Sequence, residues 1–460
     1  RDVVNEAGVE GYVVAADHYP QRAAALAELL DRHRIEVFEL AETFEQDGRV
    51  FTAGESFVVP LDQPQARLIK AMFEEVTTFE DSLFYDVSAW TFPHAFGVDY
   101  AARPSLSGLV GVRWVPDVIG NLIGGRATYA YVIPWGRYTL PRALYRLQEA
   151  GVVVRVSFEP FEADAGGIRR SFERGTLIVP VQQDGVGAET VHQLISDVVV
   201  ADGIDVYAAS TGLTPTGVDF GSPSIPVVEK PRVAILAGSG TSSYDVGELW
   251  HLLGEKMQIP VSLVELDRLD DVDLTRYSTV VTGSVFRVEE SDQNALLEWV
   301  REGGTLIATG SGAGWAARNE FLEVELAEAD EDSTRIPYAD QNEVRGAQQI
   351  GGAIFEIDLD TTHPLAFGYS NRVPVFKTNT LFFEGITPDG YDVGVYQDEP
   401  LLSGYVSEEN LDTLRGKSAL LASRLGGGSV VLMDFDPAFR AFWYGTDGLL
   451  LNAVFFGGMF

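Results

Sequence analysis

The first half of the chain contains one sequence pattern twice. The first copy reads GYVVAADHYPQRAAALAELLDRHRIEVFEL and continues to FTAGESFVVPLDQP, and the second reads AYVIPWGRYTLPRALYRLQEAGVVVRVSF and continues to FERGTLIVPVQQ. In this alignment Tyr12 corresponds to Tyr131, and Pro60 to Pro180. Each copy predicts a short apolar strand, an amphipathic helix, a second strand and a last strand ending in Val-Pro. Because a strand-helix-strand order implies a crossover, we expect a parallel pair in each copy, in one pseudo-symmetric α/β layer or two small adjacent ones.

The second half alternates strands and helices without a repeat. It follows GLTPTGVDFGSPSIPVVEKP, whose Gly, Pro and Ser content predicts a linker. Apolar strands such as RVAILAG and TLIATG then alternate with helices such as SSYDVGELWHLLGEKM, in which we expect Asp245 and Glu248 to form a capping box. The alternation predicts a doubly wound, mostly parallel sheet. The predicted class is therefore α/β, with a first unit at 1–108, a repeat-related unit at 109–211, a linker at 212–231 and a last domain at 232–460.

The charge of the chain limits its partners. Acidic residues outnumber basic ones by 68 to 33, for a formal net charge of −35. Such a charge repels phosphate backbones, so we expect no nucleic acid partner. The acidic residues are spread along the chain, which suits a surface kept soluble in concentrated salt and predicts a halophilic protein. No apolar run approaches the roughly 18 residues of a membrane span, so none is predicted.

Metal and thiol chemistry have few residues available. The chain has no Cys and six His, which excludes thiolate nucleophiles and Cys-bound zinc. His33 and Glu36 match the spacing H-x-x-E, but they fall where a helix gives way to a strand, and no third ligand is near in sequence. We therefore predict no metal site and no cofactor in this chain.

One loop of the last domain is a candidate binding site. AGSGTSSYD follows the first strand of that domain, and Ser239, Thr241 and Tyr244 lie in it. Backbone amides and hydroxyls there could hold an anion at the start of a helix, while the alternative is a tight turn with a helix cap. In an open α/β sheet ligands bind beyond the carboxyl ends of strands, so we expect Ser311 nearby, with Arg440 and Tyr444 reaching the same rim.

The segment SGAGW after TLIATG stands where a strand-to-helix nucleophile elbow would lie. Ser311 would be the nucleophile and His363, in DTTHPLAFGY, the base. The alternative is that His363 caps a turn. A serine-type hydrolase is thus one hypothesis, and a module that binds a sugar, a peptide or an anion is another.

Aromatic residues gather in FYDVSAWTFP, which includes Phe84, Tyr85, Asp86 and Trp90. Large aromatic rings bury much area, and Asp86 could accept hydrogen bonds from the amides of a turn. We interpret the segment as a structural joint between the two repeated units, with a ligand site as the alternative.

Several segments carry a resemblance over nearly the whole chain. They are FVVPLDQPQARLIKAMFE, FYDVSAWTFPHAFGV, AGSGTSSYDVGELWHLL, DTTHPLAFGY and FDPAFRAFWYGTDGLLLNAVFFG. Together they resemble the region that follows the peptidase domain in long bacterial zinc carboxypeptidases of the carboxypeptidase-A-like family. The last domain also resembles the class I glutamine amidotransferase-like fold, although the Cys nucleophile of that fold is absent.

The resemblance implies a role beside a catalyst. The zinc ligands and catalytic Glu of the family belong to an upstream peptidase domain, and we interpret this chain, which begins without Met, as a fragment of a longer protein. The implied function is a non-catalytic accessory region that docks on or shapes the upstream peptidase domain and contributes to binding a peptide or saccharide. A secreted or periplasmic location is implied with the parent protein, and zinc is expected only in the peptidase domain.

Overall fold

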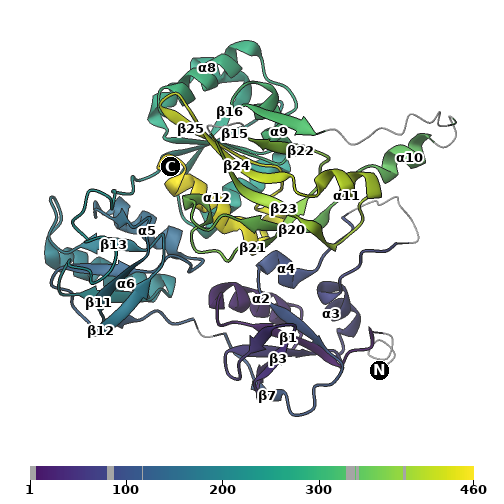
Figure 1. Cartoon of the computed structure of the whole chain (residues 1–460), viewed down its shortest axis with the longest axis horizontal. Helices are drawn as coiled ribbons and strands as arrows, with labels where there is room; N and C mark the ends of the chain where they lie inside the picture. The colour runs from purple at the N-terminus through teal and green to yellow at the C-terminus, as the bar shows by residue number, and fades with distance from the viewer. Residues whose placement is uncertain (1–6, 80–86, 117, 328–336, 338–340, 387–389) are drawn as a thin grey trace.

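The computed structural model describes residues 7–79, 87–116, 118–327, 337, 341–386 and 390–460. The chain forms three parts (Figure 1), with the first unit at the bottom of the view, the second at the left and the last domain above them. The amino-terminal end of the chain lies at the outer side of the first unit, while its carboxyl-terminal end lies near the centre.

The first unit is a five-stranded sheet of order β6-β1-β5-β2-β7 with helices packed on it. Its inner strand β1, GYVVA, is buried along its whole length, as expected for a run of small and β-branched residues. The elements are β1 Gly11–Ala15, α2 Pro20–Arg32, β2 Phe38–Leu40, β3 Phe44–Gln46, β4 Arg49–Phe51, β5 Ser56–Pro60, α3 Ala66–Phe73, α4 Phe92–Phe96, β6 Tyr100–Arg103 and β7 Val110–Arg113.

The second unit repeats this arrangement, so the predicted duplication is present in space. Tyr12 of β1 pairs with Val59 of β5, and Tyr131 of β9 pairs with Val179 of β13 in the same antiparallel register. The elements are β8 Leu122–Ile123, β9 Ala130–Ile133, α5 Leu140–Glu149, β10 Arg155–Val156, β11 Phe161–Ala165, β12 Ile168–Phe172, β13 Leu177–Pro180, α6 Ala188–Asp202 and β14 Val206–Ala209.

The prediction that the first two strands of each unit pair directly with each other is wrong. Strands β1 and β2 run in the same direction, but β5 lies between them and pairs antiparallel with both. In the second unit β13 separates β9 from β10 in the same way. The Val-Pro strand therefore occupies the place beside the first strand that the prediction gave to the second strand. Each unit has its own sheet.

Two predicted boundaries also move. Strand β7 pairs with β2, so the first sheet extends to Arg113, beyond the boundary predicted at residue 108. The segment 212–231 does not hang free as a linker, because Phe220 and Ile225 are buried in the core of the second unit. It makes isolated bridges to that unit at Glu162 and Arg155.

The last domain has an eleven-stranded mixed sheet. Its parallel half has the order β16-β15-β17-β18-β25, and β24, β23, β20 and β21 continue it antiparallel. The elements are β15 Val233–Ala237, α7 Ser243–Trp250, a π-helix η1 His251–Lys256, β16 Val261–Glu265, η2 Leu266–Asp271, η3 Leu274–Arg276, β17 Thr279–Thr282, α8 Glu290–Arg301, β18 Thr305–Thr309, α9 Ser311–Arg318, β19 Val324–Ala327, α10 Gln341–Ala347, β20 Ala353–Leu359, η4 Pro364–Ala366, β21 Arg372–Lys377, β22 Phe382–Ile386, β23 Gly390–Ser403, α11 Glu408–Leu414, β24 Ser418–Leu425, β25 Gly428–Met433, η5 Phe439–Ala441 and α12 Tyr444–Phe456.

The order of the parallel half is that of a doubly wound fold, with the connection reversing between β15 and β17. The α/β fold class predicted from the sequence is therefore confirmed. One local prediction shifts: the cap of α7 is Ser242, whose hydroxyl accepts from the Asp245 amide, so Asp245 occupies the third helical position rather than the cap.

Helix α12 joins the last domain to both units. Its sequence YGTDGLLLNAVFF is apolar on all sides, as expected for a helix enclosed by other elements, and it contains the buried polar residues Asp447 and Asn452. Just before it, Trp443 is fully buried in the core of the first unit. The three parts therefore share packing around one helix.

Candidate functional site

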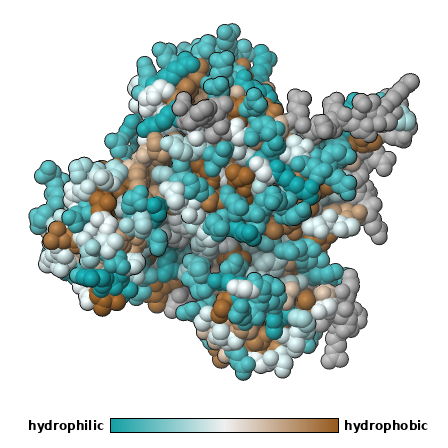
Figure 2. Space-filling view, viewed as in Figure 1, coloured by the Kyte–Doolittle hydropathy of each residue, from teal (hydrophilic) through white to brown (hydrophobic). Residues whose placement is uncertain are grey.

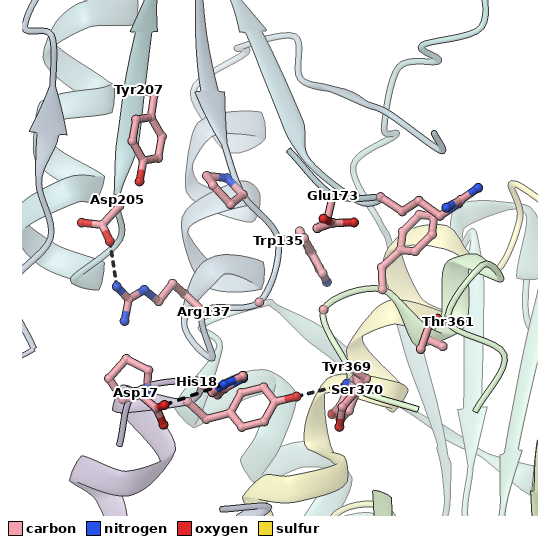
Figure 3. Close-up of a pocket in the computed structure, with 18 residues that line it drawn as sticks. Asp17, His18, Trp135, Arg137, Glu173, Asp205, Tyr207, Thr361, Tyr369 and Ser370 are labelled. Atoms are coloured by element: carbon pink, nitrogen blue, oxygen red, sulfur yellow. Dashed lines mark hydrogen bonds and ion pairs between the residues drawn. The ribbon is translucent and has the colours of Figure 1, made fainter. Parts of the chain in front are cut away.

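A cavity of about 610 Å³ lies where the three parts of the chain meet. Figure 3 shows side chains entering it from the first unit (Asp17, His18), the second (Arg137, Asp205) and the last domain (Ser370). Its size is in the range of small-molecule sites. Sequence analysis missed this cavity because its walls come from loops far apart in the chain.

The duplication explains why two of these loops face one cavity. His18 and Arg137 hold the same place in the two copies of the repeat, in the loop between the first strand and the first helix. Both line the cavity. The alignment predicted equivalent loops, but not that they would converge.

The two equivalent loops are fixed to each other by Gln21 of α2. Its side-chain amide donates to the Thr139 hydroxyl at 2.8 Å and to the Asp202 carbonyl oxygen at 2.8 Å. Its carbonyl oxygen accepts from the Thr139 backbone amide at 3.0 Å. One side chain thus sets the spacing between the walls of the first and second units.

The third wall is fixed by Asn452 of α12. Its amide donates to the backbone oxygens of Leu365 and Phe367, both at 2.9 Å, and its oxygen accepts from the Trp135 indole at 2.9 Å. Gly368 (φ +80°) touches the second unit so closely that a Cβ would lie 3.0 Å from Gly136 Cα. A larger residue at Gly368 would push the wall outward.

The cavity lining is polar and carries both charge signs. Arg137 Nη2 lies 2.7 Å from Asp205 Oδ2, and Arg174 Nη2, at the edge, lies 2.7 Å from Glu159 Oε2. Trp135 and Tyr207 add aromatic surface (Figure 3). Paired charges beside aromatic faces suit a polar ligand with hydroxyl or amide groups, because neither charge sign is in excess.

The rim of the last domain holds the loop predicted as an anion site. There the Thr241 hydroxyl donates to the Gly238 carbonyl oxygen at 2.9 Å, so it closes its own turn. Tyr244 is 82% exposed and points away from packing. Ser239 and Ser311 follow β15 and β18 as predicted. The contacts of Thr241 favour the tight-turn alternative.

The predicted strand-to-helix elbow is present, but its strained position is Gly310. Gly310 has φ 55° and ψ −131°, directly between β18 and α9, while Ser311 already begins the helix. A Cβ at Gly310 would lie 2.6 Å from Asp436 Oδ1. The position from which an elbow nucleophile projects therefore has no side chain, and a carboxylate occupies its space.

Carboxylates with raised pKa values lie beside this elbow and were missed as a group. Burial raises the pKa of Glu248 to about 8, although its oxygen accepts the Arg440 backbone N–H at 2.8 Å. Burial likewise raises the pKa of Asp436 to about 6, against the opposing effect of the Thr378 hydroxyl. Asp245 adds charge to both. The only signals in the sequence were Asp245 and Glu248 on one helix face and Asp436 after a strand.

The positions of Ser311 and His363 argue against the predicted hydrolase pair. Ser311 follows β18 and His363 follows β20, and three strands separate these two in the sheet. At about 4.8 Å per strand spacing, the lateral separation is about 19 Å, far beyond a hydrogen bond. His363 instead caps η4, where its Nδ1 accepts from the Leu365 amide, and burial lowers its pKa to about 4.

The sequence predicts Arg440 and Tyr444 at the rim that holds the loop of Ser239. The Arg440 backbone N–H donates to Glu248 of α7, the helix that follows this loop. The Arg440 guanidinium lies 5.3 Å from the centre of the Trp90 ring. Tyr444 is enclosed at the junction, with ring centres of Phe96 and Tyr138 each 4.8 Å away and Lys256 Nζ at 3.8 Å. Both residues belong to contacts between the parts of the chain.

Trp90 forms a joint, though not the predicted one. Its ring stacks on Phe442 at 6.2 Å, so it connects the first unit to the last domain rather than to the second unit. Phe84, Tyr85 and Asp86 lie outside the described residues. His33 is the exposed C-cap of α2, and within the part of the chain that the structure describes no three His, Asp or Glu side chains gather as metal ligands.

Comparison with known proteins yields structural matches only. No family model and no curated protein matches the chain. Among solved structures, a β-galactosidase from Bacillus circulans sp. alkalophilus is 15% identical, with 49% of this chain matching 31% of that one at a TM-score of 0.31. PurLQS from Thermotoga maritima is 14% identical, with 48% of this chain matching 95% of that one at a TM-score of 0.33. Similarities this weak carry no argument about activity.

The last domain has the predicted doubly wound α/β architecture, and its strand order carries that assignment. The carboxypeptidase-like resemblance gains no support from the comparisons and stays a hypothesis. Among the described residues, no helix has the length and apolar character needed to cross a membrane.

Proposed function

We propose that this chain is a non-catalytic module that binds a polar ligand in the cavity between its three parts. The observation that carries the proposal is the convergence of His18, Arg137 and Ser370, from three separate parts, on one cavity of about 610 Å³. The elbow between β18 and α9 supports the non-catalytic role, because Gly310 at its tip has no side chain that could act as a nucleophile.

Saccharides and short peptides are the ligand classes that the lining favours. Trp135 and Tyr207 offer faces for stacking, and Arg137, Asp205 and Glu173 offer donors and acceptors around them (Figure 3). The outer surface seen in Figure 2 is mostly hydrophilic with scattered apolar residues, so this face shows no large apolar site that competes with the cavity.

The test is calorimetric titration with neutral probes, namely glucose, N-acetylglucosamine and a dipeptide blocked at both ends. His18→Ala and Glu173→Ala should weaken binding of any probe that the wild-type chain binds. His33→Ala is the matched control, since His33 is an exposed histidine at the opposite end of the same helix and outside the cavity. Binding that survives both cavity variants, or no binding by any probe, would contradict the proposal.

Docking on a peptidase-like partner is a second candidate function, and one observation favours it. Strand β7 is at the edge of the first sheet, and Val112 and Val115 are 66% and 71% exposed, with Ile119 at 64% shortly after them. Exposed apolar side chains along a free strand edge are typical of a protein contact. The partner is inferred only from the resemblance to zinc carboxypeptidases.

This second candidate is tested on the whole open reading frame. It should encode a domain with H-x-x-E and a distant His before residue 1, and Val112→Lys should weaken association with that domain. Val50→Lys is the control, because Val50 is an exposed valine (46%) of the same unit on a different strand. A reading frame without such a domain would remove this candidate.

A further inference from the structure

A second cavity of about 500 Å³ adjoins the first, between the first unit and the last domain. His18, Tyr19, Tyr369 and Ser370 line both cavities. The second one differs in its charge, because Arg22 of α2 lines it and is only 5% exposed. A buried guanidinium is costly unless an anion compensates it.

Arg22 has aromatic neighbours and no carboxylate partner. Its Cζ lies 4.3 Å from the centre of the Tyr19 ring and 4.9 Å from that of Tyr369. Its Nε is buried without a hydrogen bond, and it takes part in no ion pair within the described ranges. The two rings hold the guanidinium plane between them, which leaves its N–H edge as the part that can meet a ligand.

The other basic side chains of this cavity have acidic partners. Arg49 pairs with Asp17 at 2.6 Å and with Asp99 at 3.0 Å. His94 Nε2 lies 2.6 Å from Glu75 Oε1. Arg372 lies 3.6 Å from Glu356. These pairs leave Arg22 as the cation of the cavity for which the described residues supply no counterion.

A buried carboxylate of the same junction, Asp447, has partners other than Arg22. Asp447 Oδ2 accepts from Tyr138 at 2.5 Å and from Lys256 Nζ at 3.1 Å. Its other oxygen, Oδ1, is buried without a hydrogen-bond partner, and Asp447 forms an ion pair with Lys256 and none with Arg22 within the described ranges. The Tyr369 hydroxyl is also buried, and its one polar neighbour within the described residues is the Arg22 guanidinium, from which it can only accept, so its own O–H can donate to a ligand beside Arg22.

The backbone makes room for the guanidinium. Gly97 has φ +59°, and a Cβ there would lie 3.0 Å from Arg22 Nη1 and 2.8 Å from Gly445 Cα. The glycines let the end of α4 and the start of α12 approach each other closely beside the guanidinium. The setting is therefore built around Arg22 and not a chance surface contact.

We propose that Arg22, with the Tyr369 hydroxyl, binds a carboxylate group of a ligand in this second cavity. A planar guanidinium donates two parallel hydrogen bonds to a carboxylate, which matches its geometry. The carboxylate comes either from a small free acid or from the end of a peptide. The site stands apart from the proposed function, because its contacts require no ligand in the cavity of Figure 3.

The test measures binding by calorimetry and thermal unfolding with sodium acetate, sodium sulfate, a short peptide acid and the same peptide as its amide, each at constant ionic strength. Acetate and the peptide acid should bind the wild-type chain, and the amide should not. Arg22→Met should weaken carboxylate binding roughly 10- to 100-fold, the range expected for a charged hydrogen bond of about 1.5–3 kcal/mol.

Two further variants keep the test decisive. Arg22→Lys retains the charge but loses the paired donors, so an intermediate loss is expected, and it serves if Arg22→Met fails to fold. Arg32→Met is the matched control, since Arg32 is an exposed arginine of the same helix that lines neither cavity, and it should leave binding unchanged. Tighter binding of the peptide acid than of acetate assigns the site to peptides, and equal binding assigns it to small acids.

Three results would overturn the proposal. They are no response of the wild-type chain to any carboxylate, binding of sulfate without acetate, and an Arg22→Met variant that binds acetate as the wild type does. Because the neutral probes for the first cavity contain no carboxylate, failure of this site and failure of the proposed function are distinguishable.

Discussion

Replacing Asp447 by Asn should loosen the junction that frames both cavities. Asp447 is completely buried and accepts from Tyr138 of the second unit and from Lys256 of the last domain. Asparagine keeps the shape but removes the charge, so the Lys256 ammonium, whose side chain is 12% exposed, loses its counterion. Breaking a buried pair in this way costs about 3–5 kcal/mol.

We expect the lower end of that range, about 3 kcal/mol, for two reasons. Lys256 retains its contact with the Tyr444 ring at 3.8 Å, and its partial exposure lets water reach the ammonium. The assay is urea unfolding followed by tryptophan fluorescence, since Trp135 and Trp443 lie at the junction. The double variant with Lys256→Met should recover part of the loss, because no buried charge is then left without a partner.

Asp412→Asn is the matched control for this experiment. Asp412 pairs with Arg415 at the surface, where its side chain is 69% exposed, so its loss should cost less than about 1 kcal/mol. If Asp447→Asn unfolds within about 1 kcal/mol of the wild type, or the control costs as much, the account of a charge-fixed junction is refuted.

Three other outcomes are expected. Glu248→Gln should match the wild type at pH below the ordinary glutamate pKa of 4.5, because burial raises the folded-state pKa of Glu248 to about 8. The wild type should then lose stability relative to the variant as pH rises from 4.5 to about 8, with no further change above that. Parallel pH curves of unfolding free energy would contradict this. Gly310→Ala should lower the free energy of unfolding by about 2 kcal/mol or more, because Gly310 has a positive φ and an added Cβ would clash with Asp436. The double variant Gly310→Ala/Asp436→Ala should recover part of this loss. No effect of Gly310→Ala in urea unfolding would show that the elbow is not strained. The melting temperature should rise between low salt and about 2 M salt if charge repulsion limits stability, and a flat or falling curve in calorimetry would reject the halophilic hypothesis.

Local sequence patterns predicted the strands and helices better than they predicted which strands pair with each other. The runs GYVVA and AYVI became inner buried strands, and the Val-Pro strands that follow were expected from the same alternation. The insertion of β5 between β1 and β2 was not predictable, because pairing of strands separated by a long stretch leaves no local signal. The two copies of the repeat could be aligned in sequence, but the order of the strands within each sheet could not be predicted.

The candidate site was harder still, because it is built between parts of the chain. His18 and Arg137 look like ordinary loop residues until the two units are placed side by side. Asp447 and Asn452 carried a signal that could have been used, since together with Thr446 they are polar residues in an otherwise mostly apolar helix. Arg22 carried none, because an arginine in the first turn of an amphipathic helix reads as solvent-facing.

Hydrogen exchange in the presence of the neutral probes tests the central claim most directly. If a ligand sits between the three parts, one probe should slow exchange together in the loops at 16–20, 134–138 and 366–370, and His18→Ala should abolish the effect. Protection confined to a single one of these loops would contradict the account. Protection at 238–242 and 310–312 instead would also contradict it, because it would place binding at the rim of the last domain.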